Sequence, residues 1–307
     1  MIALIIGGQG FIGQNLIRKL TDEGYKVRVF SRSNGNEHLN TTSVQYIKGQ
    51  FENIQDFPSL FKDVDVVYHL LSTTIPRTSN DNPTNDIQSN VLNTIKLLEI
   101  CKTSKIKKIV FTSSGGTVYG LPIYVPITEQ HPTNPICSYG ITKLMIEKYL
   151  YMFKYLYGLD YKVLRISNPY GPYQKTVSEQ GVIGVFLGKI LRGETIEIWG
   201  DGSVCRDYIY IDDVVEAIYL ASVKATKSDL FNVGSGIGTS LSELLEILKK
   251  TLNREIKVQY KQARTLDSPI SLLDSSVARK ELGWIPEVDI RTGIEKTWDW
   301  MIKRNYY

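Results

Sequence analysis

The feature that most constrains the fold is a glycine-rich turn close to the start of the chain. The sequence Gly7-Gly8-Gln9-Gly10-Phe11-Ile12-Gly13 follows the apolar run 2–6 directly and opens an amphipathic segment over 11–23. Glycines at positions 7, 10 and 13 let the backbone turn tightly and approach a pyrophosphate, whose charge the amides of a helix N-terminus stabilise. Glycines also occur in ordinary strand-to-helix turns, but a position inside a strand-helix-strand unit favours dinucleotide binding.

Apolar runs of about five residues alternate with amphipathic segments through the first half of the chain. Continuous apolar strands separated by helices predict a parallel sheet covered on both faces, because parallel crossovers place helices there. We therefore expect an α/β fold, a doubly wound parallel sheet of the Rossmann type. Its strands are predicted at 2–6, 27–30, 44–48, 64–68, 108–111 and 161–166, and its helices at 11–23, 53–61, 86–103 and 139–156.

The alternation weakens after the segment Asn168-Pro169-Tyr170-Gly171-Pro172. Further helices are predicted at 182–192, 212–223, 241–252 and 290–302, with short strands at 196–199 and 231–233. We expect an NAD(P)-binding Rossmann domain over 1–170, to which 207–233 returns. A smaller C-terminal α/β domain that binds the substrate is expected from 171–206 and 234–307.

Composition excludes several classes of protein. The 307 residues carry 36 Lys and Arg against 32 Asp and Glu, a net charge of +4 that is spread along the chain, whereas nucleic-acid binders concentrate positive charge on one face. Three cysteines without metal-ligand spacing predict neither a disulfide framework nor a metal site, and a reducing compartment fits. No apolar run approaches the roughly 18 residues of a membrane span, and the N-terminal run is too short for a signal peptide. We expect a cytoplasmic protein without nucleic-acid or membrane partners.

The residues after the second predicted strand bear on which dinucleotide binds. An acidic side chain there would accept hydrogen bonds from the adenosine ribose of NAD, but the chain has Ser31 and Arg32. Because a guanidinium binds phosphate bidentately, this pair favours NADP over NAD. An Arg32 that stacks on adenine or points to solvent would leave the choice open.

A second motif, Tyr139-Gly140-Ile141-Thr142-Lys143, opens the longest predicted helix. Residues four apart share a helix face, so the Lys143 ammonium is expected near the Tyr139 phenol. A nearby cation stabilises the phenolate and lowers the phenol pKa from about 10, which would make Tyr139 a general base. In a chain with 19 tyrosines this spacing becomes specific only together with the glycine turn and the preceding strand 111–114.

These motifs resemble the extended short-chain dehydrogenase/reductases of the nucleotide-sugar epimerase/dehydratase type, and UDP-hexose 4-epimerases most of all. The resemblance extends from residue 1 to about residue 302. The segments that carry it are 7–13, 112–120, Tyr139 with Lys143, 165–172, 200–208 and Leu282-Gly283-Trp284-Ile285-Pro286.

The resemblance implies roles for individual residues. Tyr139 would handle the proton of the sugar 4-hydroxyl, and Lys143 would lower its pKa and hold the nicotinamide ribose. Besides the glycine turn and the Ser31-Arg32 pair, the cofactor would be lined by Gln50, Leu71, Ser72, Asn90 and Pro169. The substrate diphosphate would be clamped by Arg206 and Arg264. The other implied substrate contacts are Asn168 near the diphosphate, Asp267 on the nucleotide ribose, and Trp199, which either packs in the smaller domain or lies near the base.

The chain departs from the family pattern at two positions. The family usually has Ser or Thr four residues before the tyrosine of the Val-Tyr-Gly segment, where the hydroxyl bonds the reacting oxygen, but this chain has Gly115. Ser114 and Thr117 are the available replacements. After the third strand, Gln50 stands where an Asp commonly meets the adenine.

The resemblance implies redox chemistry at C4 of a nucleotide-diphosphate sugar, and we expect a UDP-hexose 4-epimerase. The alternative is an NADPH-dependent reductase of a 4-keto-6-deoxy sugar nucleotide, linked for example to dTDP or GDP. A 4,6-dehydratase is disfavoured because Gly116 and Thr117 occupy the positions of the Asp-Glu pair that removes water. A non-catalytic dinucleotide-sensing protein is suggested only by Gly115. A homodimer formed through the helices 86–103 and 139–156 is also implied.

Overall fold

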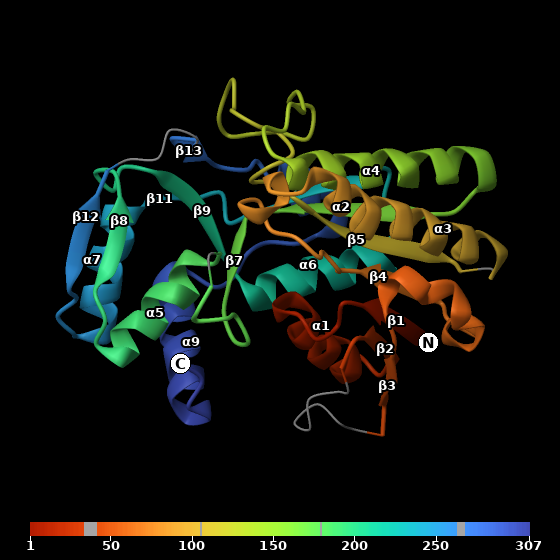
Figure 1. Ribbon diagram of the computed structural model, residues 1–307, viewed down its shortest axis with the longest axis horizontal. Helices are drawn as coiled ribbons and strands as arrows, with labels where there is room; N and C mark the ends of the chain where they lie inside the picture. The colour runs from red at the N-terminus through yellow and green to blue at the C-terminus, as the bar shows by residue number, and fades with distance from the viewer. Residues whose placement is uncertain (34–41, 105, 179, 263–267) are drawn as a thin grey trace.

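The computed structural model describes residues 1–307 apart from 34–41, 105, 179 and 263–267 (Figure 1). A seven-stranded sheet lies at its centre, with strand order β10-β6-β5-β4-β1-β2-β3 and every neighbouring pair parallel. Its strands are β1 (Ile2–Ile6), β2 (Lys26–Ser31), β3 (Val44–Lys48), β4 (Val66–His69), β5 (Lys108–Ser114), β6 (Tyr161–Ile166) and β10 (Leu230–Val233).

Helices cover both faces of this sheet. One face carries α1 (Phe11–Asp22) and α6 (Ile211–Val223), and the other carries α3 (Asn93–Thr103) and α4 (Ser138–Tyr157) (Figure 1). Alternate residues of β1 point to opposite faces. Ala3 and Ile5 join the core with α1 and α6, whereas Leu4 and Ile6 join the core with α3 and α4. Because both faces are covered, the central strands β1 and β4 are almost entirely apolar, and the predicted doubly wound sheet is confirmed.

Two predicted helices are broken in the structure. The segment predicted as a helix over 53–61 forms two short 3₁₀ helices, η2 (Phe51–Asp56) and η3 (Pro58–Phe61), because Pro58 lacks an amide hydrogen and cannot continue a helix. The helix predicted over 86–103 begins earlier and changes its winding. It consists of α2 (Pro83–Asp86), a π-helical turn η5 (Ile87–Leu92) and α3.

A smaller part of the molecule lies beside the sheet, at the left of Figure 1. Its strand β9 (Cys205–Tyr210) pairs with β7 (Asn168–Tyr170), β11 (Gly238–Ser240) and β13 (Ile270–Ser271), and β8 (Ile196–Trp199) pairs with β12 (Val258–Lys261). Its helices are α5 (Val182–Arg192), α7 (Leu241–Leu252) and α9 (Ile290–Arg304), whereas α8 (Ser276–Leu282) packs against α6 and against β10 of the large sheet.

The two parts share segments of chain. Strand β10 joins the edge of the large sheet beside β6. The fully buried Trp284 donates from its indole nitrogen to the carbonyl oxygen of Asp213 in α6, at 2.8 Å.

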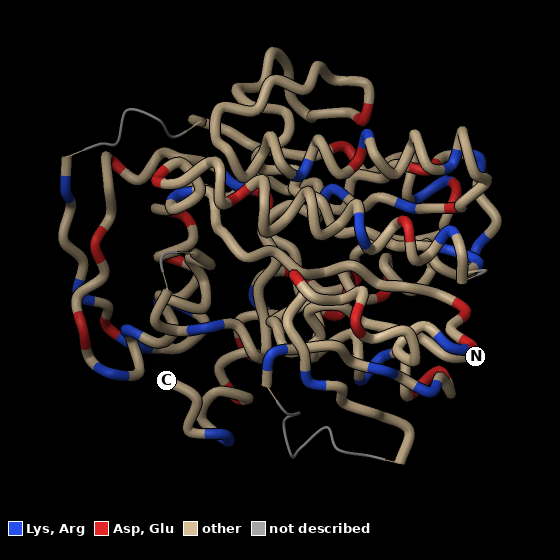
Figure 2. Tube along the Cα trace, turned by 45° about the vertical axis from the view of Figure 1, so that its right-hand side comes forward, with Lys and Arg blue, Asp and Glu red and all other residues tan. Residues whose placement is uncertain are grey.

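Charged and apolar residues are distributed without long blocks. Lys and Arg are interspersed with Asp and Glu along the trace (Figure 2). Within the described ranges, no helix has both the length and the apolar character that crossing a bilayer requires.

Candidate active site

Four strands of the large sheet end side by side at one edge. In the strand register, Ile6 of β1 faces His69 of β4, His69 faces Phe111 of β5, and Ser114 at the end of β5 faces Ile166 of β6. The residues that follow these strands therefore lie along one edge of the sheet, where ligands of doubly wound folds bind. These residues include Gly7, Leu71, Ser72, Asn168 and Pro169.

The glycine turn forms a cradle that larger residues would fill. Gly7 has a positive φ of +88°, and a Cβ there would lie 2.9 Å from the backbone nitrogen and Cα of Leu71. A Cβ on Gly13 would lie 2.5 Å from the Cα of Gly8. The first bond within α1 runs from the Gln14 amide to the Gly10 carbonyl, at 3.0 Å. The preceding amides of residues 11–13 belong to the helix N-terminus, so the turn fits a dinucleotide pyrophosphate.

The segment after β2 is tied to the glycine turn. The Ser31 hydroxyl donates to the Ser33 carbonyl at 2.7 Å, and the Gln9 amide nitrogen donates to the same oxygen at 3.0 Å. Arg32 between them is exposed, so its guanidinium is free to reach a ligand at this end of the sheet. Gln50, which follows β3, is also exposed.

Asn90 is buried and bonded to the segment that follows β4. Its Oδ1 accepts the Thr73 amide at 3.0 Å, and its Nδ2 donates to the Thr73 hydroxyl at 2.8 Å. Asn90 therefore fixes the backbone next to Leu71 and Ser72. Its own contact with a cofactor stays a prediction.

Tyr139 and Lys143 lie at the start of α4. The Lys143 Nζ lies 5.6 Å from the centre of the Tyr139 ring and donates to the Thr112 carbonyl of β5 at 3.0 Å. It also lies 4.7 Å from the centre of the Phe111 ring. The helical spacing thus brings the ammonium to the phenol as expected, and β5 holds it there.

The acidity of this pair differs from the expectation. Burial raises the pKa of Tyr139 above its ordinary value of 10, and nearby Cys137 and Asp86 add to the rise. Burial lowers the pKa of Lys143 to about 8. The expected lowering of the phenol pKa by Lys143 is therefore not found in the protein without ligand, because a phenolate loses its hydration in this environment. A Tyr139 phenolate requires further positive charge in the site.

The loop after β5 leaves two candidate hydroxyls in place of the one missing at Gly115. A Cβ on the buried Gly115 would lie 2.5 Å from the Leu273 Cδ1, so the Leu273 side chain fills the space that a serine would need. The Thr117 Oγ1 is buried, and none of the described residues bonds it. Ser114 is half-buried, and its carbonyl accepts the Val118 amide at 3.2 Å.

The smaller part of the molecule contributes the predicted substrate residues. Strand β7 pairs with β9 so that Asn168 faces Tyr208, two positions from Arg206. The Asn168 Nδ2 donates to the Asp207 carbonyl at 3.0 Å, and the Arg206 Nη1 donates to the carbonyl of Ser268 at 2.7 Å. Trp199 ends β8 and is 40% exposed. The predicted Arg264 and Asp267 lie outside the described residues.

The structure adds buried charges that the sequence did not single out. Arg165 of β6 binds Glu147 of α4 through two bonds, Nε to Oε1 at 3.1 Å and Nη2 to Oε2 at 2.6 Å, and the Ser113 hydroxyl donates to Glu147 at 2.5 Å. Glu147 lies one turn after Lys143, so the i+4 spacing that pairs Tyr139 with Lys143 could have identified it. Asp86, one helical turn before Asn90, is the other such residue.

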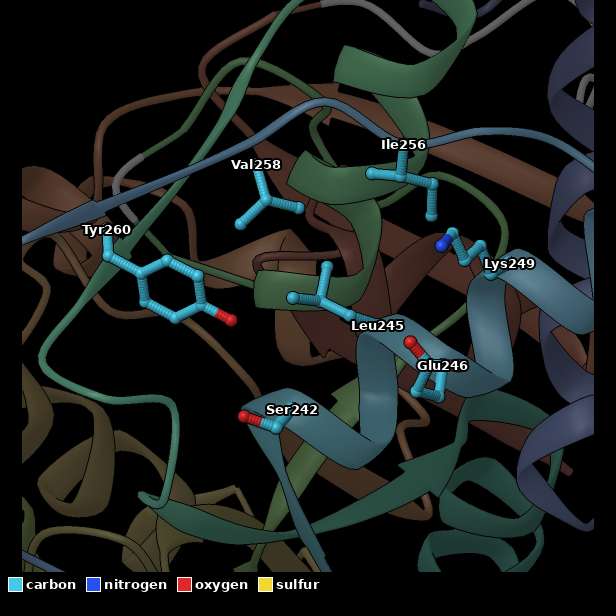
Figure 3. Close-up of a pocket in the computed structure, with 7 residues that line it drawn as sticks. All are labelled: Ser242, Leu245, Glu246, Lys249, Ile256, Val258 and Tyr260. Atoms are coloured by element: carbon cyan, nitrogen blue, oxygen red, sulfur yellow. The ribbon is translucent and has the colours of Figure 1, made fainter.

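A separate cavity of about 180 Å³ lies away from these residues (Figure 3). Leu245 and Lys249 of α7 face Val258 and Tyr260 of β12 across it. It contains none of the predicted site residues. Among the described residues, no group of three or more His, Cys, Asp or Glu side chains is placed to hold a metal ion.

The model of the NAD dependent epimerase/dehydratase family matches residues 3–234. The chain belongs to this family. The expected resemblance is thereby confirmed, and a solved structure of a UDP-glucose 4-epimerase with UDP-glucose from Thermotoga maritima confirms the fold. That structure superimposes with a TM-score of 0.94 at 36% identity, over 99% of this chain and 100% of that chain.

Two curated relatives also match over nearly their whole length. A UDP-glucose 4-epimerase of Mycolicibacterium smegmatis is 36% identical over 97% of each chain. A dTDP-4-dehydro-6-deoxyglucose reductase of Escherichia coli is 34% identical over 95% of each chain.

Proposed function

We infer that the chain catalyses redox chemistry at C4 of a nucleotide-diphosphate sugar and is a UDP-hexose 4-epimerase. The observation that carries this proposal is the meeting of the Tyr139-Lys143 pair and the glycine cradle at one edge of the sheet. The similarity to UDP-glucose 4-epimerases over the full chain supports the assignment.

In this proposal, Tyr139 takes the proton of the sugar 4-hydroxyl and later returns it. Lys143 holds the cofactor ribose, and the amides of residues 11–13 bind the pyrophosphate. When bound, the oxidised dinucleotide supplies a positive charge and a hydride acceptor that is regenerated in each turnover. The added charge favours the Tyr139 phenolate, whose pKa burial alone raises. Ser114 or Thr117 bonds the reacting oxygen, and Asn168, Trp199, Arg206, Arg264 and Asp267 bind the nucleotide diphosphate.

A reductase of a 4-keto-6-deoxy sugar nucleotide is the second candidate. It is favoured by the Ser31-Arg32 pair, because a consumed cofactor is typically NADPH, and by the similarity to the reductase of Escherichia coli. We favour the epimerase because several residues support it, whereas only Ser31 and Arg32 support the reductase.

The deciding experiment identifies the cofactor that co-purifies with the protein and then offers two substrates separately. Interconversion of UDP-glucose and UDP-galactose without added cofactor is the expected result. Stoichiometric loss of NADPH with a 4-keto-6-deoxy sugar nucleotide, and no interconversion of UDP-sugars, would replace the epimerase with the reductase.

The preference between NAD and NADP is part of the proposal. The exposed Arg32 and the lack of an acidic residue at the end of β2, where the chain has Ser31, support NADP. Arg32→Ala is expected to weaken NADP binding about tenfold or more, because a charge-assisted bond is lost, and to leave NAD binding nearly unchanged. Titration calorimetry with both dinucleotides measures this, and equal losses would refute the phosphate contact.

We further propose a cytoplasmic homodimer. The free thiols of Cys101, Cys137 and Cys205 support a reducing compartment. Exposed apolar residues on α4, among them Tyr151 and Tyr155, support a contact with a second copy.

A further inference from the structure

Asp86 is a fully buried carboxylate behind the start of α4. Its Oδ1 accepts the Thr74 hydroxyl at 2.6 Å and the Asn90 Nδ2 at 2.8 Å, and its Oδ2 accepts the Ser138 hydroxyl at 2.7 Å. The side chains that bond it are uncharged. Hydroxyl bonds of this length suit a carboxylate acceptor, whose two oxygens accept and do not donate.

The donors to Asp86 come from three separate segments. Thr74 belongs to the segment that follows β4, Asn90 to the π-helical turn η5, and Ser138 is the first residue of α4. The first of these segments passes the glycine turn through Leu71, whose backbone lies next to Gly7. Asp86 therefore joins the segment beside the glycine turn to the helix that carries Tyr139 and Lys143.

The short helix η4 (Thr78–Asn80) completes this attachment. The Ser79 hydroxyl accepts the Tyr139 amide at 3.0 Å, and the Asn80 Oδ1 accepts the Ser138 amide at 2.9 Å. Helix η4 thus holds the backbone amides of Ser138 and Tyr139, while Asp86 holds the Ser138 side chain.

The charge of Asp86 acts on both members of the pair. It raises the pKa of Tyr139 and opposes the lowering of the Lys143 pKa by burial. The other titratable groups that face the pair are Cys137, which directly precedes α4, Glu147 of α4 and His69 of β4. Burial lowers the pKa of His69 to about 3, so its ring is neutral. Glu147 is bound to Arg165 of β6 and opposes the lowering of the Lys143 pKa more strongly than Asp86 does. Helix η4 contains no charged residue.

We propose that Asp86 is a positioning residue, which holds the start of α4 against the segment after β4 and keeps one negative charge behind the Tyr139-Lys143 pair. Its effect on turnover rests on the proposed function, whereas its effect on Lys143 does not. The two parts are therefore tested separately.

The first test uses Asp86→Asn, which removes the charge and keeps the hydrogen bonds. Its oxygen can accept Thr74 and Asn90, and its amide nitrogen can donate to the Ser138 hydroxyl, which is able to accept. The titration of Lys143 is followed by carbon-13 NMR of labelled lysine, with Lys143→Met assigning the signal. We expect the midpoint, about 8 in the wild type, to fall in Asp86→Asn, because one of the two negative charges that oppose its lowering is lost. An unchanged midpoint overturns the proposal whether or not the protein is an epimerase.

The second test uses turnover, with Ser138→Ala as the matched variant. In Asp86→Asn the acidic limb of the pH profile of kcat moves to lower pH by about one unit, because the Tyr139 pKa falls. Ser138→Ala retains the charge, so its profile and its Lys143 midpoint stay in place while kcat falls about tenfold.

If Asp86→Asn does not fold, Ser138→Ala decides the positioning role, and an unchanged kcat overturns it. If the Lys143 midpoint falls in Asp86→Asn as expected but the wild type shows no chemistry at C4, the proposed function is refuted and the role of Asp86 is not.

Discussion

Tyr139 is the residue on which the proposed chemistry depends. Tyr139→Phe removes the hydroxyl and nothing else, so the fold and dinucleotide binding are expected to persist. Turnover is expected to fall by about 10² to 10⁴, the range in which a positioned acid or base contributes. Steady-state kinetics with UDP-glucose and calorimetry with the dinucleotide measure the two effects. Tyr151→Phe, on the exposed side of the same helix, is the control, and equal rates in all three proteins would exclude Tyr139 as the base.

Lys143 makes the stability of the fold depend on pH in a defined direction. Its pKa falls from 10.5 in the unfolded chain to about 8 in the fold, so the folded protein binds fewer protons between these pH values. Its contribution to the free energy of unfolding therefore rises as pH increases from about 8 to 10.5 and is unfavourable below 8. Lys143→Met removes this penalty and is expected to stabilise the protein at pH 7 by on the order of 1–3 kcal/mol.

Urea unfolding at pH 7 and pH 10 measures this difference for the wild type and Lys143→Met. The gain in the free energy of unfolding should shrink at the higher pH. Lys148→Met, at an exposed lysine of the same helix, is the control without a gain. A gain in Lys143→Met that is equal at both pH values would contradict the buried-charge explanation.

For single residues, the sequence predicted contacts correctly where the two residues lie on the same helix. The i+4 spacing placed Lys143 beside Tyr139, because both lie on one helix. It gave the wrong direction for the Tyr139 pKa in the protein without ligand, because burial depends on segments far along the chain that cover the helix. The same limit hid Asp86, whose partners Thr74 and Ser138 are brought together only by the fold.

At the level of elements, the glycine turn between β1 and α1 is the most exacting. Gly13→Ala would place a methyl group against the backbone of Gly7 and Gly8, at 2.7 Å from the Gly7 oxygen. The turn must open, which is expected to cost about 1–3 kcal/mol of stability and to weaken dinucleotide binding. Gly116→Ala, whose added Cβ would meet no atom within 4 Å, is the control for stability. Unchanged stability and dinucleotide affinity in Gly13→Ala would show that the turn can accommodate a Cβ atom at this position.

Elements with strong patterns were predictable, and short ones were not. The predicted strands of the large sheet are short runs rich in apolar residues, so they stand out in the sequence. Strands β7, β11 and β13 have two or three residues, too few to show a period, and they exist because β9 pairs with them. The sequence also does not predict the π-helical turn η5, because the spacing of apolar residues does not reveal one extra residue within a helical turn.

The whole molecule combines segments that the sequence keeps far apart. Leu273 fills the space beside Gly115, and the Ile127 amide donates to the Leu272 carbonyl at 2.8 Å. The loop after β5 is therefore shaped by the C-terminal part of the chain. For this reason the sequence could show that a hydroxyl is missing at Gly115 but could not decide between Ser114 and Thr117.

The proposed dimer depends on a surface of the whole molecule. Helices α3 and α4 lie side by side on the outer face of the sheet (Figure 1). Tyr151 and Tyr155 of α4 are 61% and 80% exposed, and Leu92, just before α3, is 48% exposed. In a symmetric dimer this surface would meet its own copy, so a charge introduced near the axis would face the same charge. Tyr155→Glu is therefore expected to shift the protein from dimer to monomer.

Analytical ultracentrifugation at micromolar concentration measures the mass of each variant. Tyr260→Glu adds the same charge at another exposed tyrosine, in β12, which is 57% exposed. Strand β12 lies in the smaller part of the molecule, far from α4 in Figure 1. Its mass should stay that of the wild-type dimer, because the charge is outside the proposed contact. A monomeric wild type, or a dimer that survives Tyr155→Glu, would exclude this surface as the interface. Since Tyr139, Lys143 and the glycine turn all belong to one chain, the monomer should still bind dinucleotide.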